Sequence, residues 1–143
     1  EGYNIKITKQ EIIKWKKKSK ICIVRSMYNS TFELFQSANR ELEKNNITPS
    51  VIKVPGAFEI PVMIARNIKK YDGFIAVGCI IKGETPNFSL ISNAIINGIM
   101  KLSILHKKPI GNAIITCLND DQAKKRADKG KEAAKAVLEV LNG

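Results

Sequence analysis

Residues 73–88 of the chain, GFIAVGCIIKGETPNF, decide its fold. The segment 73–81 is apolar on both faces, which is the pattern of a central strand in a parallel sheet covered by helices on both sides. Gly83 and Pro86 then interrupt the strand, and the residues after them follow a helical period. A buried strand that turns directly into a helix is typical of α/β proteins, so we expect the same unit elsewhere in the chain.

The rest of the sequence alternates between short apolar runs and helical patterns. Further strands are expected at 21–26, 50–54 and 109–116, and helices at 30–46, 61–70, 86–106 and 120–143. Ser30 precedes Glu33 at the spacing of a capping box, which marks the start of the first helix. This order predicts a three-layer α/β domain with a four-stranded parallel sheet and right-handed crossovers.

The bulk composition indicates one folded domain. With 143 residues and 44% apolar content, we expect a basic N-terminal arm at 1–19 and a single domain at 20–143. Three cysteines without C-x-x-C spacing and a single histidine predict neither a disulfide framework nor a metal site. No apolar run approaches the roughly 20 residues of a membrane span, and we expect no signal peptide. The expected location is therefore the cytoplasm.

The net charge of +11 is compatible with nucleic acid, with anionic small substrates, or with a lysine-rich composition alone. The lysines are scattered in pairs over the predicted helix faces, and aromatic residues do not interleave with them. Even the dense run at 14–20 holds only one aromatic residue, Trp15. This pattern argues against nucleic acid as the partner.

In parallel sheets of this kind, ligands bind outside the carboxyl ends of the strands. Each predicted strand is followed by a loop that carries aromatic, polar or charged side chains. The candidate site is therefore formed by the loops at 26–30, 55–59, 81–88 and 117–121.

Four side chains in or just after these loops each have two interpretations. Tyr28 either stacks on a flat ring or covers the core as a rim aromatic. Glu59 either accepts hydrogen bonds from a ligand or compensates the charge at a helix start. Thr85 either binds phosphate at a helix start or is an ordinary N-cap before Pro86. Arg126 either pairs with a phosphate or lies on a solvated helix face.

Taken together, the loops resemble those of the lumazine synthase family. The resemblance rests on Tyr-Asn after the first strand, VPGAFEIP at 54–61, GCIIKGETPNF at 78–88 and QAKKRADKGKEAA at 122–134, and it extends over residues 21–141. It implies a flavodoxin-like three-layer αβα fold, with room for an N-terminal strand from a neighbouring subunit. It also implies a homopentamer with active sites between subunits, and some family members assemble decamers or 60-subunit shells.

The resemblance implies a reaction of riboflavin biosynthesis that needs no cofactor. In this reaction, 5-amino-6-(D-ribitylamino)uracil condenses with 3,4-dihydroxy-2-butanone 4-phosphate to give 6,7-dimethyl-8-ribityllumazine. By position in this sequence, the implied substrate-binding residues are Tyr28, Ala57, Phe58, Glu59, Cys79, Ile80, Ile81 and Asn112, and the implied phosphate-binding residues are Glu84, Thr85 and Arg126. Asn112 falls where the neighbouring subunit closes over the ring.

The sequence departs from the family pattern at two positions. Met27 replaces the usual arginine before the stacking ring, and Asn87 replaces the proton-transfer histidine. The chain's single histidine, His106, lies about 28 Å further along a helix at 1.5 Å per residue. Because asparagine cannot take a proton near pH 7, we expect a slowed synthase that relies on substrate orientation.

Two alternatives remain open at this point. The chain could be a pentameric lumazine- or riboflavin-binding protein, or a shell-forming homologue, that has weak chemistry. It could also be an FMN carrier, although SMYNSTF at 26–32 is a poor phosphate loop for one.

Overall fold

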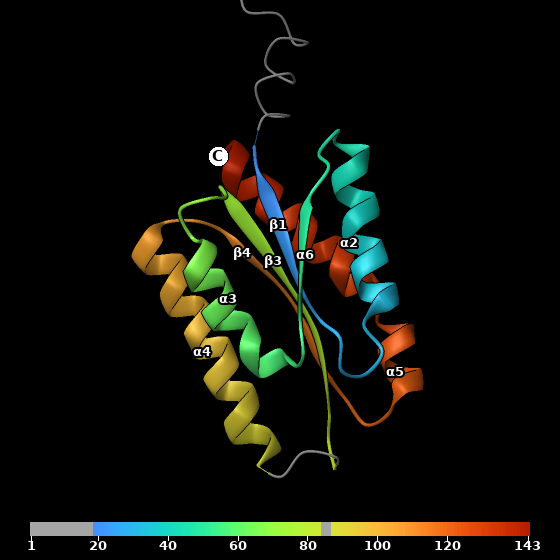
Figure 1. Ribbon diagram of the computed structural model, residues 1–143. Coiled ribbons are helices and arrows are strands. Elements are labelled where there is room, and N and C mark those ends of the chain that lie inside the picture. Colours follow the sequence, from blue (N-terminus) through green and yellow to red (C-terminus); the bar gives the residue numbers. More distant parts are fainter. Residues whose placement is uncertain (1–18, 84–86) are drawn as a thin grey trace, which may run out of the picture.

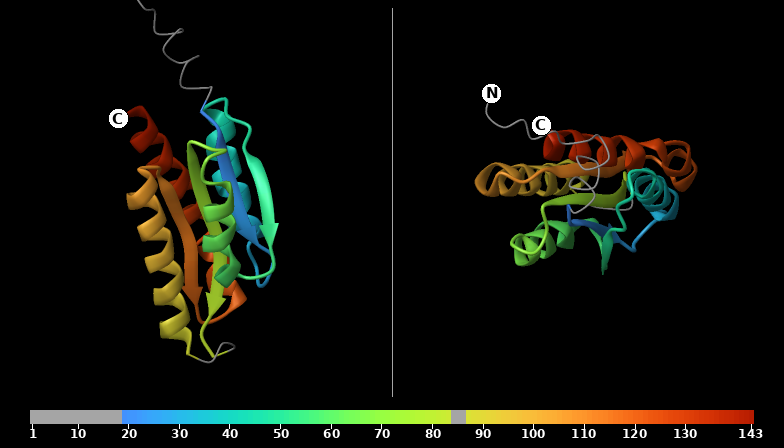
Figure 2. Two further views of the ribbon diagram at one scale, coloured as in Figure 1. Left: turned by 60° about the vertical axis from the view of Figure 1, so that its left-hand side comes forward. Right: turned by 90° about the horizontal axis from the view of Figure 1, so that it is seen from above.

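The computed structural model describes residues 19–83 and 87–143. The expected arm at 1–19 lies outside the described residues apart from Ser19, and so do Glu84 and Thr85. Within the described residues, all strands belong to one parallel sheet in the order β2-β1-β3-β4. Figures 1 and 2 show this sheet between two layers of helices, which confirms the predicted fold class.

The strand positions follow the apolar runs closely. The strands are β1 (Ile21–Ser26), β2 (Ser50–Val54), β3 (Gly73–Ile81) and β4 (Ile110–Cys117). The first three coincide with their predicted ranges, and β3 is buried along its whole length, as a central strand should be. β4 begins one residue later than predicted because Pro109 has no N–H to donate to the sheet. The carbonyl of Pro109 instead accepts a hydrogen bond from the backbone of Phe74.

The helices are close to their predicted ranges but differ at several ends. The described residues form α2 (Phe32–Lys44), a short 3-10 turn η1 (Ala57–Glu59), α3 (Ile60–Asn67), α4 (Phe88–His106), α5 (Asp120–Lys125) and α6 (Asp128–Asn142). The predicted capping box of Ser30 and Glu33 is wrong, because Thr31 occupies the N-cap position of α2. The Thr31 hydroxyl is buried and donates to the carbonyl of Ser26 at 2.7 Å, which closes the loop after β1.

The single helix predicted at 120–143 is in fact two helices. Arg126 leaves the helical conformation with φ −102° and ψ 18°, and α6 starts two residues later. Sequence propensity does not reveal this break, because lysine, arginine and alanine all favour helix. The break turns the chain from the end of β4 onto the axis of α6, which then packs along α2 (Figure 1).

The two faces of the sheet carry separate cores. One core lies under α2 and α6 and includes Leu34, Ile75 and Val137. The other lies under α3 and α4 and includes Ile64 and Phe74, among others. The α2–α6 contact depends on Gly130, since a Cβ there would meet the backbone carbonyl of Leu34. The loops at the strand ends therefore connect strands and helices that are held in place by two well-packed cores.

Helix α4 presents an exposed apolar face. Leu90, Met100, Ile104 and Leu105 are all exposed on it, the last at 73%. Among the described residues, α4 is the one helix that is long and apolar enough to cross a membrane by length and composition. The expectation that no segment reaches that length is therefore wrong for α4. Only 11% of its most apolar window is buried, so residues 19–83 and 87–143 leave this face largely uncovered.

Candidate functional site

The loops after β1 and β2, the end of β3 and helix α4 surround a pocket of about 320 Å³ at the carboxyl edge of the sheet, which we call the central pocket. Its lining residues are Tyr28, Asn29, Gly56, Ala57, Phe58, Cys79, Ile80, Ile91 and Ile95. Five of the predicted substrate-binding residues thus lie around one largely apolar cavity. Its size and composition suit a small organic ligand with a flat ring.

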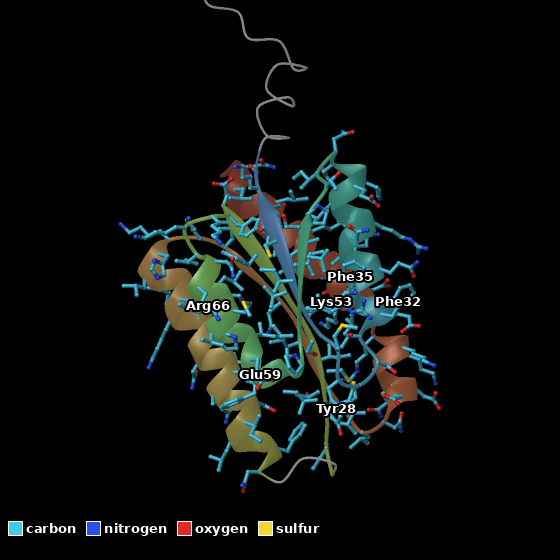
Figure 3. All side chains as sticks on the ribbon, in the orientation of Figure 1. Tyr28, Phe32, Phe35, Lys53, Glu59 and Arg66 are labelled. Atoms are coloured by element: carbon cyan, nitrogen blue, oxygen red, sulfur yellow. The ribbon has the colours of Figure 1, made fainter. Side chains whose placement is uncertain are left out.

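The loop after β1 is fixed by hydrogen bonds to two other strand ends. The backbone N–H of Tyr28 donates to the carbonyl of Pro55 at 2.9 Å, at the end of β2. The side-chain amide of Asn29 donates to the carbonyl of Cys79 at 3.0 Å, near the end of β3. Asn29 has a φ of 68°, a left-handed conformation that asparagine tolerates well. Tyr28 itself is 63% exposed, so its ring is available to a ligand (Figure 3).

The loop after β2 holds Glu59 by its own backbone. One carboxylate oxygen of Glu59 accepts a hydrogen bond from the Gly56 N–H at 2.9 Å. This contact matches the helix-start interpretation of Glu59, and it also fixes the carboxylate at the rim of the central pocket, which Gly56 lines. Phe58, between them, is 63% exposed and lines the same pocket.

The end of β3 forms the floor of the central pocket. Cys79 and Ile80 line it, and the side chain of Ile80 belongs to the core on the pocket's side of the sheet. The side chains of Cys79 and Ile81 belong to the core on the opposite face. Gly78 lets η1 approach the strand closely, because a Cβ there would stand 3.2 Å from the Cβ of Ala57. Any contact that Ile81 makes with a ligand in this pocket must therefore come from its backbone.

A second, smaller pocket of about 240 Å³ lies beside the end of β4, and we call it the β4-side pocket. It is lined by Lys82, Phe88, Thr116, Cys117, Leu118, Gln122 and Arg126. The guanidinium of Arg126 donates to the carbonyl of Thr116 at 2.8 Å. Arg126 therefore lies against the strand end, rather than on a helix face turned away from the sheet.

Asn87 stands directly before α4, with φ 60° and ψ 37°. Its side chain makes no capping hydrogen bond. Both interpretations of Thr85 concern a residue outside the described ranges. His106 is the last residue of this 19-residue helix and lies at its far end, as the sequence spacing predicts.

The chain by itself does not bring all the predicted site residues together. Asn112 lies within the edge strand β4, where its side-chain oxygen accepts a hydrogen bond from the backbone of Ile114. Arg126 lines the β4-side pocket instead of the central pocket, and Glu84 and Thr85 lie outside the described residues. The predicted site is therefore divided between two parts of the carboxyl edge.

Asn29 and Lys82 each line one of the pockets, and the sequence patterns predicted no role for either residue. Asn29 had a weak signal, since asparagine in a loop after a strand often bonds to backbone. Lys82 had no usable signal, because lysines are scattered along the whole chain. Ile91 and Ile95 lie within the helix predicted at 86–106, and they line the central pocket from α4.

The thiol of Cys22 is held in its protonated, unreactive form at neutral pH. Burial raises the pKa of the Cys22 thiol to about 11, and hydrogen bonds with the backbone of Ile52 and the side chain of Tyr71 offset part of that effect. All three cysteines are buried. In the part of the chain that the structure describes, no cluster of His, Cys, Asp and Glu could hold a metal ion.

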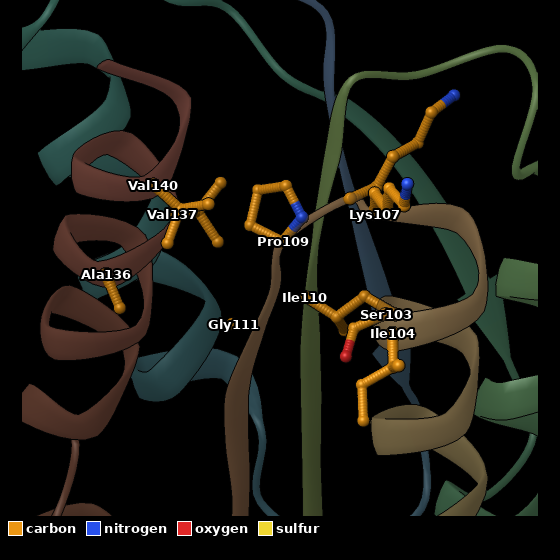
Figure 4. Close-up of a pocket in the computed structure, with 10 residues that line it drawn as sticks. Ser103, Ile104, Lys107, Pro109, Ile110, Gly111, Ala136, Val137 and Val140 are labelled. Carbon is orange, nitrogen blue, oxygen red and sulfur yellow. The ribbon is translucent and has the colours of Figure 1, made fainter. Parts of the chain in front are cut away.

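A larger pocket of about 420 Å³ lies at the opposite end of β4, between α4 and α6 (Figure 4). Its walls are mainly apolar, from residues such as Ile104, Ile110 and Val137. It contains none of the predicted site residues and lies beside the start of β4, away from the carboxyl edge. Its size therefore does not make it the candidate site.

The fold and the two pockets define a class of protein. It is a flavodoxin-like α/β protein whose candidate site, at the carboxyl edge of a parallel sheet, combines a pocket with aromatic side chains and a pocket with cationic ones. The sequence profile of the 6,7-dimethyl-8-ribityllumazine synthase family matches residues 18–143. The chain belongs to this family.

Individual relatives agree with the family profile, and each is named 6,7-dimethyl-8-ribityllumazine synthase. A protein from Methylibium petroleiphilum is 42% identical over 132 residues, which cover 86% of this chain and 82% of the relative. One from Agrobacterium fabrum is 41% identical over 120 residues, covering 76% and 81%. One from Buchnera aphidicola is 40% identical over 146 residues, covering 93% and 92%. These matches confirm the resemblance inferred from the loop motifs.

Proposed function

We propose that this chain is a 6,7-dimethyl-8-ribityllumazine synthase that acts in riboflavin biosynthesis in the cytoplasm. It condenses 5-amino-6-(D-ribitylamino)uracil with 3,4-dihydroxy-2-butanone 4-phosphate and releases phosphate and water. The observation that carries the proposal is the central pocket, which gathers an exposed aromatic ring, the PGAFE turn and the end of β3 around one cavity.

The pyrimidine substrate occupies the central pocket. Its ring stacks on Tyr28, and its edge contacts the backbone of Cys79, Ile80 and Ile81. Its ribityl chain runs along Ala57 and Phe58. Support for this placement comes from the carboxylate of Glu59, which the Gly56 N–H holds at the rim and which can accept hydrogen bonds from hydroxyl groups.

The phosphate of the second substrate binds to Arg126, together with Glu84 and Thr85. An arginine fork is suited to phosphate because it donates two parallel hydrogen bonds. When phosphate leaves, a carbon–oxygen bond breaks and its electron pair stays on the phosphate oxygen. Positive charge fixed at this position therefore favours the departure step.

The complete site forms between two copies of the chain in a ring, which we propose to be a homopentamer, free or built into a decamer or 60-subunit shell. Asn112 and Arg126 lie on the β4 side, and Tyr28 and Phe58 lie on the β1–β2 side. A ring that sets the β4 edge of one copy against the central pocket of the next unites them. The exposed apolar face of α4 supports such contacts between copies.

Asn87 makes this a slow synthase. A positioned general acid–base contributes about 10²- to 10⁴-fold in rate, and asparagine cannot supply it near neutral pH. Holding the amine and the ketone together can still provide effective molarities on the order of 10⁵ M. The reaction then relies on orientation and phosphate binding, with protons moving through water, Glu59 or the substrate phosphate.

The test is an assay of the purified protein with both substrates, run beside the variant Asn87→His. We expect the wild type to form lumazine above the uncatalysed rate and the variant to be faster. If only Asn87→His forms product, the natural chain is not a working synthase.

The asparagine at position 87, where the family has its proton-transfer histidine, also favours a second candidate function, that of a lumazine- or riboflavin-binding protein. Calorimetry distinguishes the two functions. Tight riboflavin binding without any response to phosphate would support the binding protein. Phosphate binding together with product formation would support the synthase.

A further inference from the structure

We propose that Lys82 is a second phosphate-binding residue, which acts with Arg126 in the β4-side pocket. This inference rests on the proposed function and extends it to a residue that the motif comparison did not single out. It starts from the fact that two cations from distant parts of the sequence line one small pocket.

The backbone places both cations at the end of the same strand. The N–H of Lys82 donates to the carbonyl of Cys117 at 2.8 Å, which fixes the residue that follows β3 against the end of β4. The guanidinium of Arg126 donates to the carbonyl of the preceding residue, Thr116, at 2.8 Å. Two adjacent residues of β4 thus anchor Lys82 and Arg126, so their positions relative to each other are set by the sheet.

The described residues that line the pocket give it positive charge. They include Lys82 and Arg126 and no aspartate or glutamate. The ion pairs found within residues 19–83 and 87–143 join Lys44 to Glu41 and Lys129 to Glu132, so neither Lys82 nor Arg126 pairs with a carboxylate there. Two like charges held close together favour an anion that carries two charges, and a phosphate ester does so near neutral pH.

The two cations are suited to different tasks. Arginine presents a rigid fork of donors, whereas the ammonium of lysine is a compact charge on a flexible stem. Arg126 is held against Thr116 and fixes the orientation of the phosphate. Lys82 is exposed, and its flexible side chain stays close to the phosphate group. It thereby stabilises the negative charge that builds up on that group as it leaves the substrate.

The experiment is calorimetric titration of the assembled protein with inorganic phosphate, for the wild type, Lys82→Gln and Lys82→Arg. The matched control is Lys124→Gln, which removes the same charge from exposed α5 close to Arg126 but outside the pocket lining. We expect Lys82→Gln to weaken phosphate binding about tenfold, as for loss of a charge-assisted hydrogen bond. Lys82→Arg should restore most of the affinity, and Lys124→Gln should change it less than twofold.

Steady-state assays separate binding at this pocket from binding at the central pocket. Lys82→Gln should raise KM for the butanone phosphate and leave KM for the pyrimidine substrate unchanged.

Equal phosphate affinities for Lys82→Gln and Lys124→Gln would overturn the inference, and so would a wild type that binds no phosphate. The titration needs no turnover, so it tests phosphate binding by Lys82 even if the synthase proposal fails. If Lys82→Gln keeps wild-type kinetics while product forms, only the role of Lys82 is lost.

Discussion

The side-chain amide of Asn29 donates a hydrogen bond to the backbone carbonyl of Cys79, 50 residues further along the chain. This contact joins the loop that carries Tyr28 to the strand that forms the floor of the central pocket. Because the bond crosses from one strand end to another, it sets the position of the aromatic ring relative to that floor. The proposed binding site for the pyrimidine ring therefore depends on the side-chain amide of Asn29, which need not touch the ligand itself.

We predict that Asn29→Gly weakens binding of the pyrimidine substrate about threefold to tenfold, the range for one hydrogen bond of about 1 kcal/mol. Glycine keeps the left-handed φ of 68°, so the variant removes the bond without adding backbone strain. The matched control is Asn46→Gly, which has a φ of 61° and follows the end of α2, away from both pockets. KM for the pyrimidine measures the effect, and equal values for both variants would contradict it.

A histidine at position 87 should add a pH dependence that the wild type lacks. Histidine is among the residues that accept a left-handed φ, so Asn87→His should fold normally. The ratio of the variant rate to the wild-type rate should rise through pH 6.5, where the imidazole loses its proton and becomes able to accept one. Other titrating groups are common to both proteins and cancel in the ratio. A ratio that stays constant from pH 5.5 to about 8 would exclude proton transfer by this residue.

Gly130→Ala should destabilise the domain strongly. The added Cβ meets the backbone carbonyl of Leu34, and neither helix can move without disturbing the core between α2 and α6. We expect a loss of about 3 kcal/mol in the free energy of unfolding by urea. Gly98→Ala is the control, since its Cβ meets Pro61 at 3.4 Å and α4 gains up to about 1 kcal/mol of helix propensity. Equal stabilities would show that the α2–α6 contact is not tight.

The buried thiol of Cys22 should make stability fall at alkaline pH. Its pKa is raised to about 11 in the folded protein, so the native chain holds a proton that the unfolded chain loses near pH 9. The contribution of the Cys22 thiol to the free energy of unfolding is complete below pH 9. It declines between pH 9 and 11, by about 1.4 kcal/mol per pH unit. Urea unfolding of Cys22→Ala should lack this part of the slope. Identical slopes for the two proteins would contradict the prediction.

The sequence predicted the sheet well because β3 is apolar on both faces and its neighbours are short Ile- and Val-rich runs. It did not predict the end of α5 at Arg126, because lysine, arginine and alanine all favour helix and no local signal marks the break. The bond between Asn29 and Cys79 joins residues that only the folded chain brings close. In the same way, Lys82 could not be distinguished from the other lysines until the sheet placed it beside Arg126.

The division of the site between two sides of one chain has a genetic consequence. In the proposed ring, a defect at Tyr28 and a defect at Arg126 damage different halves of the shared site, so two inactive proteins should restore each other. In a ring assembled from equal amounts of both, about a quarter of the interfaces pair an intact central pocket with an intact β4 side. Mixed assemblies should therefore regain activity that neither parent has, whereas a site confined to one chain would show no such complementation.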